Sequence, residues 1–271
     1  MRSHPGFTKS FGILILAAIA SVRPIALNAQ APAQSIAAAP SSATAILSRS
    51  PQSGLQTIYV KDPSGQLTLA AECECPFQPS ISLSGSRIVF RVAGPGRTSA
   101  AYYKDAPFTG DAVRIDAAAD STDDGALSST PALSGNGQFV VFSSTGNLDA
   151  AIDDTASTAD LFIRDLSSGA TERLTLGAQL TGNPSISSNG RYVAFATASQ
   201  LAVEDVNNVG DVYLIDRSKP EGGLRLLTAP GLNAGATDAS ISVGGSAVAF
   251  TSAADNLVAD DVNGVADVFV V

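Results

Sequence analysis

Two phrases recur in a fixed order along this chain, and they constrain its fold more than any other feature. The first runs from a small residue through an aliphatic residue, Ser and a Gly-containing turn into a short strand that ends in Phe. Its clear copies end at Phe90, Phe142, Phe195 and Phe250. The intervals between these positions are 52, 53 and 55 residues, and a fainter copy upstream contains Ile36 and Leu47 at the matching places.

The second phrase is a strand of aliphatic and aromatic residues that follows the first phrase in every unit. Its copies are TIYVKD (57–62), AAYYKD (100–105), ADLFIRD (159–165), GDVYLID (210–216) and ADVFVV (266–271). A Gly-containing turn and a further short strand follow most copies. The pairs Asn136–Gly137 and Asn189–Gly190 suit tight hairpin turns that need a positive φ. Each unit is therefore predicted to contain four strands joined by turns.

Four-stranded units of this length in series are typical of a β-propeller, in which neighbouring blades cover each other's faces. We predict an all-β propeller of four-stranded antiparallel blades, with about five repeat units and an incomplete last one. The predicted units span about 34–78, 79–130, 131–183, 184–238 and 239–271. A β-sandwich with accidental internal similarity is the alternative, and the shared order of the two phrases argues against it.

Residues 1–29 are predicted to form a signal peptide. Arg2 and Lys9 give a positive start, and the apolar stretch over 11–22 is shorter than the ~20 residues needed to span a bilayer. Cleavage is expected after Ala29, and an uncleaved anchor is the alternative. An Ala-, Pro- and Ser-rich segment that can include the first strand follows over 30–43, and the repeats occupy 44–271. The expected location is the periplasm or the medium.

The phrase S-x-x-G-x-x-V-x-F, followed by D-V-F-V or D-L-F-I, resembles the repeat of TolB-type propellers over about residues 34–271. The copies nearest to the pattern run over 184–216 and 239–271. The resemblance implies a fold of exported bacterial proteins that hosts many activities. Such propellers commonly have six blades, so either an N-terminal segment supplies the closing strand or the chain is a piece of a longer propeller. The sequence shows neither TolB's preceding small domain nor a hydrolase domain, so a Tol-system role and peptidase activity are not implied.

The charge of the chain limits its partners. The formal net charge is −9, and removal of the leader, which carries Arg2, Lys9 and Arg23, leaves 13 basic against 25 acidic residues, a net of −12. An acidic chain without a run of Lys or Arg is a poor ligand for phosphate backbones and anionic membranes. We expect a protein or small-molecule partner, no nucleic acid, and no membrane contact beyond the export signal.

The residue types available for catalysis are also few. The only histidine is His4, inside the predicted leader, so a mature chain lacks the commonest general base and metal ligand. A Ser-His-Asp triad is then impossible, and no phosphate loop or dinucleotide fingerprint is present. We expect a non-enzymatic, exported propeller that serves as a binding scaffold. The alternatives are a calcium-binding propeller module and a fragment of a larger propeller-containing hydrolase.

The loops between the second and third strands carry the most chemically suggestive pattern. The fourth unit reads EDVNNVGD and the fifth DDVNGVAD, and oxygen-bearing side chains stand at the first, third and seventh places when counting starts at Asp205 or Asp261. These candidate metal ligands are Asp205, Asn207, Asp211, Asp261, Asn263 and Asp267. The third unit has a degraded copy, DDTASTAD, with Asp153, Asp154 and Asp160.

This spacing matches part of a calcium loop, although Val209 and Val265 occupy the fifth place, where calcium loops carry another oxygen. Asp and Asn also stabilise turns by accepting hydrogen bonds from nearby backbone N–H groups. The sequence therefore leaves two interpretations open, calcium ligands and turn formers, and the second is favoured. No other cofactor is expected.

Overall fold

The structure is a computed structural model that describes residues 8–9, 36–38, 43–51, 53–73, 79–92, 99–117, 129–148, 158–219 and 223–271. Within these residues the protein consists of strands and turns, with no helix. Accordingly, this part of the chain offers no helix with the length and apolar character needed to cross a membrane. The strands form five four-stranded antiparallel sheets, which confirms the predicted all-β class.

Each sheet contains four strands, and four of the five sheets follow the chain order without a crossover. The first sheet contains β2 (Ile36–Ala38), β3 (Thr44–Arg49), β4 (Gln56–Lys61) and β5 (Leu67–Cys73). The second contains β6 (Ser80–Ile81), β7 (Arg87–Val92), β8 (Ala100–Asp105) and β9 (Val113–Arg114). The third contains β10 (Ala132–Leu133), β11 (Phe139–Ser144), β12 (Asp160–Asp165) and β13 (Thr171–Arg173).

The last two sheets continue the same pattern. The fourth contains β14 (Ser185–Ile186), β15 (Tyr192–Thr197), β16 (Asp211–Asp216) and β17 (Leu224–Leu226). The fifth contains β18 (Ala236–Ile241), β19 (Val248–Ser252) and β20 (Asp267–Val270), with β1 (Thr8–Lys9) as its outer strand. The two recurring phrases thus form the second and third strands of every blade.

In four blades, the phenylalanine that ends the first phrase stacks on an aromatic residue of the third strand. Phe195 lies directly opposite Tyr213 across β15 and β16, and their rings stack with centroids 5.8 Å apart. The equivalent stacked pairs are Phe90–Tyr102, Phe142–Phe162 and Phe250–Phe269. Cross-strand aromatic pairs of this kind stabilise a sheet beyond the area they bury.

The turn glycines of the first phrase pack against the preceding blade. Gly190 has a φ of 74° and Gly245 a φ of 77°, as the turn chemistry predicts. A Cβ on Gly190 would overlap the Phe139 ring of the third blade, and a Cβ on Gly245 would overlap the Tyr192 ring of the fourth. These positions therefore require glycine both for backbone conformation and for close contact between blades.

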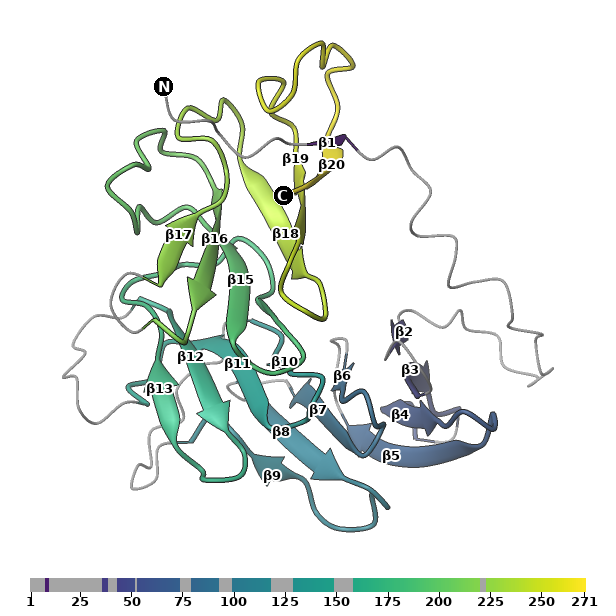
Figure 1. Cartoon of the computed structure of the whole chain (residues 1–271). Helices are drawn as coiled ribbons and strands as arrows, with labels where there is room; N and C mark the ends of the chain where they lie inside the picture. Colours follow the sequence, from purple (N-terminus) through teal and green to yellow (C-terminus); the bar gives the residue numbers. More distant parts are fainter. Residues whose placement is uncertain are drawn as a thin grey trace.

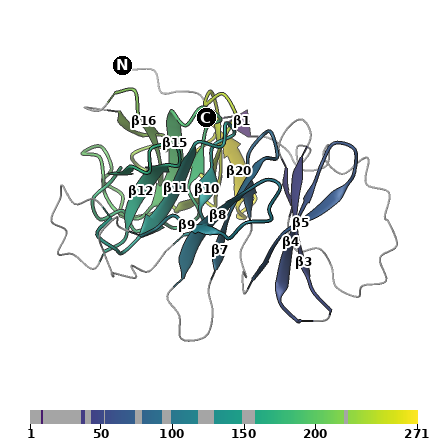
Figure 2. The ribbon, with the colours of Figure 1, turned by 90° about the horizontal axis from the view of Figure 1, so that it is seen from below.

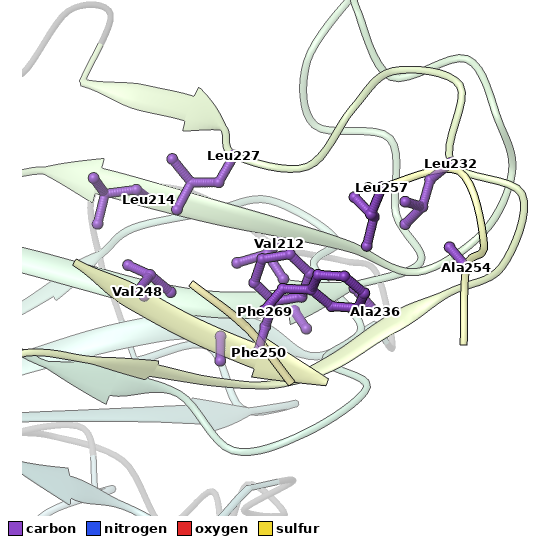
Figure 3. Packing of buried hydrophobic residues seen from close by; sticks show 13 residues of the cluster. Val212, Leu214, Leu227, Leu232, Ala236, Val248, Phe250, Ala254, Leu257 and Phe269 are labelled. Atoms are coloured by element: carbon purple, nitrogen blue, oxygen red, sulfur yellow. The ribbon is translucent and has the colours of Figure 1, made fainter. Parts of the chain in front are cut away.

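Successive blades share their hydrophobic faces because side chains alternate along each strand. In β11, Val140 and Phe142 join the cluster with the second sheet, while Val141 joins the cluster with the fourth sheet. Figure 3 shows the cluster between the fourth and fifth sheets, where Val212 and Leu214 of β16 meet Phe250 and other residues of the fifth sheet. The core is therefore a series of layers between blades.

Backbone hydrogen bonds join the blades at one recurring corner. Leu83 N donates to Gly135 O at 2.8 Å, Asn136 N donates to Ser188 O at 2.8 Å, and Ser188 N donates to Val243 O at 2.9 Å. Each bond joins the first hairpin of one blade to that of the next. The repeat thus fixes both the packing and the relative position of neighbouring blades.

The blades follow one another around an arc, with the first and fifth sheets at its ends (Figures 1 and 2). Four hydrophobic clusters fill the four interfaces along this arc, and among the described residues none joins the fifth sheet to the first. β1 pairs with β20, Thr8 opposite Val270 and Lys9 opposite Phe269. An N-terminal segment thus supplies the outer strand, and it belongs to the predicted leader, most of which lies outside the described residues.

Candidate functional site

The six candidate ligands fall in two equivalent loops, which differ in burial. In the β15–β16 loop, Asp205 is 3% exposed, Asp211 at the start of β16 is fully buried, and Asn207 is half-buried. In the β19–β20 loop, Asp261 and Asp267 are half-buried and Asn263 is exposed. Of the third-unit residues, Asp153 and Asp154 lie outside the described residues, and Asp160 begins β12.

Both loops contain the same asparagine-centred turn. Asn207 Oδ1 accepts a hydrogen bond from Val209 N at 3.0 Å, and Asn263 Oδ1 accepts one from Val265 N at 3.0 Å. The residue after each asparagine has a positive φ, 59° at Asn208 and 67° at Gly264. The asparagines therefore act as turn formers in both loops.

Asp205 is held by an aromatic hydroxyl from the neighbouring strand. Tyr213 Oη donates to Asp205 Oδ2 at 2.5 Å, and Tyr213 Oη itself accepts a hydrogen bond from Leu201 N at 3.2 Å. Burial, and then the adjacent Asp205 carboxylate, raise the pKa of Tyr213 well above its usual range. The hydroxyl therefore stays protonated and serves as a permanent donor to Asp205.

Asp211 lies on the same face of β16 as Tyr213, because the two are separated by one residue. Thr228 Oγ1 donates to Asp211 Oδ1, and Val212 N donates to Thr228 Oγ1 at 3.3 Å. Burial raises the pKa of Asp211, and the negative charge of Asp205 raises it further, while Thr228 and Asn207 oppose the shift. Asp205 and Asp211 are therefore close enough to repel each other.

Three polar atoms of this loop are buried without a hydrogen-bond partner. They are Asp205 Oδ1, Asn207 Nδ2 and Asp211 Oδ2. Within the described part of the chain, neither Asp205 nor Asp211 forms an ion pair with Lys or Arg. Two neighbouring buried carboxylates without a positive partner are costly, and each leaves one oxygen unsatisfied.

The equivalent aspartate of the third blade has a positive partner. Asp160 Oδ2 accepts a hydrogen bond from Arg173 Nη1 at 2.5 Å, and the two side chains are 2% and 1% exposed. Arg173 lies opposite Phe162 in the β12–β13 ladder, and Leu226 lies opposite Tyr213 in the β16–β17 ladder. The fourth blade therefore has leucine where the third has its neutralising arginine.

The loop of the fifth blade satisfies its own groups. Asn263 Nδ2 donates to Asp267 Oδ2 at 2.8 Å, and both Asp261 and Asp267 take part in further interactions. The same amide in the fourth blade, Asn207 Nδ2, makes no hydrogen bond of ordinary geometry, although Asn207 lies near enough to Asp211 to lower the pKa of that carboxyl. Of these two loops, the fourth-blade loop thus brings its aspartates together in a buried place.

The fourth loop borders a surface depression of about 540 Å³. Its lining residues are Gln200, Leu201, Ala202, Val203, Asp205 and Val206. Within the described ranges, no group of three or more His, Cys, Asp or Glu side chains is placed to hold a metal ion. A cation at this loop would therefore use the two carboxylates together with neutral oxygens, such as those of water.

The same two loops expose apolar side chains. Val203 and Val206 are 92% and 67% exposed in the β15–β16 loop, and Val262 and Val265 are 91% and 60% exposed in the β19–β20 loop. Both loops lie at the ends of adjacent blades where β16 and β20 begin (Figure 1). We call these four residues the valine edge.

Sequence reasoning missed Tyr213, Thr228 and Leu226 as parts of the site. Tyr213 follows Asp211 with the spacing that places both side chains on one face of a strand, so the sequence contained a signal for it. Thr228 ends the phrase GLRLLT in the fourth unit, and Thr175 ends the equivalent phrase ATERLT in the third. The change from Arg173 to Leu226 is also visible once these two phrases are aligned.

No protein-family model matches the chain, and no curated protein sequence does either. Solved structures match its fold. TolB from Acinetobacter baumannii aligns with a TM-score of 0.54 and 17% identity over 88% of this chain and 54% of that protein. Oligogalacturonate lyase from Vibrio parahaemolyticus aligns with a TM-score of 0.55 and 11% identity, over 84% and 62%. The tricorn protease aligns with a TM-score of 0.51 and 15% identity, over 81% and 19%.

These similarities confirm that the chain has the fold of TolB-like β-propellers. The chain spans about half the length of Acinetobacter TolB. The similar structures include TolB and enzymes of unlike activity, and at such identity they share a fold rather than a function.

Proposed function

We propose that this TolB-like propeller is an exported, non-enzymatic scaffold that binds a protein partner through the valine edge. The observation that carries the proposal is the exposure of Val203, Val206, Val262 and Val265. Each of the two loops exposes two valines, and exposed apolar surface of this kind marks interaction sites on soluble proteins, because its contact with water is unfavourable. Loops held on a rigid scaffold are also where binding residues concentrate.

The non-enzymatic part of the proposal is supported by the residue types. The only histidine, His4, lies in the predicted leader, and Tyr213 and Asp205 are engaged with each other inside the loop. In the buried Asp205–Asp211 pair, Tyr213 and Thr228 each occupy one carboxylate oxygen as donors. The partner is expected to present an apolar surface free of strong negative charge, because this chain is acidic.

Site-specific photo-crosslinking tests the proposal. A photoreactive residue at position 203 or 262 is expected to capture one protein from the cell envelope, whereas the same group at Val113, exposed on β9 of the second sheet, captures none. The double variant Val203→Asp and Val262→Asp should abolish the capture, since it places charge in the contact. Equal capture from positions 113 and 203, or capture that survives the double variant, would contradict the valine edge as the binding surface.

A further inference from the structure

We propose that the β15–β16 loop binds one divalent cation, with calcium as the expected ion, through the carboxylates of Asp205 and Asp211. This inference goes beyond the scaffold function and does not depend on it. It also selects one of the two loops that the sequence pattern could not tell apart.

The first argument is charge balance across the repeat. In the second blade the buried Asp116 pairs with Arg114 at 2.9 Å, and in the third blade the buried Asp160 pairs with Arg173. Arg114 and Arg173 occupy the same register position, opposite Tyr102 and Phe162. In each of these two blades, the arginine that ends the outermost strand thus lies beside a buried aspartate.

The fourth blade breaks this pattern in two ways. Leu226 replaces the arginine, and Asp205 adds a second carboxylate beside Asp211. No described Lys or Arg forms an ion pair with either aspartate. A positive charge is therefore missing in the fourth blade, where two negative charges are buried side by side, and a divalent cation supplies it.

The second argument is the presence of two unsatisfied carboxylate oxygens. Asp205 Oδ2 and Asp211 Oδ1 are occupied by Tyr213 and Thr228, which leaves Asp205 Oδ1 and Asp211 Oδ2 buried and without a partner. Both belong to side chains at most 3% exposed. Oxygen ligands of this kind favour hard cations, and calcium accepts irregular sites in which water completes the shell.

The third argument is access. Asp205 lines a depression of about 540 Å³, so an ion with its water ligands can approach that carboxylate from solvent, while Asp211 is fully buried. The equivalent loop of the fifth blade has no such need, since Asn263 already donates to Asp267. The alternative occupant is a proton shared by the two aspartates, and it requires no metal.

Calorimetric titration of the chelator-treated chain with calcium chloride tests the proposal. We expect one site per chain and a higher unfolding temperature in calcium than in chelator. Asp211→Asn and Asp205→Asn should each weaken calcium binding at least tenfold. The matched control Asp267→Asn, in the corresponding position of the fifth blade, should leave the affinity within twofold of the original.

A second variant separates loss of binding from loss of folding. Leu226→Arg places the arginine of the third blade beside Asp211, so the chain should stay folded and lose the calcium-dependent rise in unfolding temperature. The proposal is overturned if the folded original chain takes up no calcium at millimolar concentration, as a shared proton implies. It is equally overturned if Asp267→Asn abolishes binding while Asp211→Asn does not, or if Leu226→Arg retains full calcium affinity.

Discussion

Arg173 and Leu226 occupy the same register position on the outer strands of adjacent blades. Arg173 forms an ion pair with the buried Asp160, whereas Leu226 offers no charge to Asp211. The third and fourth blades therefore share a buried aspartate at the start of the third strand and differ in what balances its charge. In the third blade Arg173 balances the charge of Asp160, and the contribution of this ion pair to stability can be measured directly.

Arg173→Leu should destabilise the protein by about 3–5 kcal/mol, because it removes the arginine that forms an ion pair with the buried Asp160. The change can be measured as the free energy of unfolding in urea. Arg225→Leu is the control, since Arg225 is exposed on β17, and it should cost less than about 0.5 kcal/mol. Equal effects of the two substitutions would show that the Arg173–Asp160 pair is not a structural requirement.

Gly190→Ala should destabilise the protein by about 2–5 kcal/mol, because the new Cβ both strains a positive φ and overlaps Phe139. Gly54→Ala has nearly the same φ, 71°, but nothing within 4 Å of the added atom. Its cost should be only about 1–2 kcal/mol. Thermal unfolding of the two variants separates the two causes, and similar costs would mean that the hairpin does not touch the preceding blade.

Phe142→Ala should cost about 3–5 kcal/mol, because the ring is fully buried and stacks on Phe162 with centroids 6.1 Å apart. Leu176→Ala should have little effect, since Leu176 is 64% exposed. Chemical denaturation of both variants makes the comparison. A small cost at Phe142 would be incompatible with the cluster between the second and third blades.

Stability should fall in acid through Asp216. Arg191 holds the pKa of Asp216 far below its ordinary value of 3.8, and Ser218 adds to the shift. Because the folded pKa is the lower one, Asp216 stabilises the fold above about pH 4, and this contribution is lost as the pH falls toward the folded pKa. Asp216→Asn should flatten the dependence of unfolding free energy on pH below 4, whereas Asp111→Asn, at an exposed site, should not.

Much of the fold could be predicted from the sequence, because the repeat encodes it locally. The Phe-ending strand, the strand after it and the turn glycines each have a period-two pattern or a positive-φ signal, and Phe195 and Gly190 occupy the expected places. The pairing of β1 with β20 agrees with the expectation that an N-terminal segment can supply the outer strand of the last unit.

The site could be predicted only in part, because spacing along the chain does not determine burial. The DxN pattern places Asp205 and Asp261 alike, but Ala236 N of the following blade donates to Gly210 O at 2.7 Å and joins the fourth loop to that blade. Among the described residues no sheet follows the fifth blade, so Asn263 remains exposed. The role of Leu226 depends on cross-strand register, which the pattern of one strand does not contain.

The most direct test of this account is differential scanning calorimetry of the chain in calcium and again in chelator. If the blades stabilise one another through shared faces and the fourth loop needs a cation, one cooperative transition will appear in both buffers, with a higher midpoint in calcium. Several separate transitions, at temperatures that calcium does not change, would contradict both the shared faces and the cation at Asp205 and Asp211.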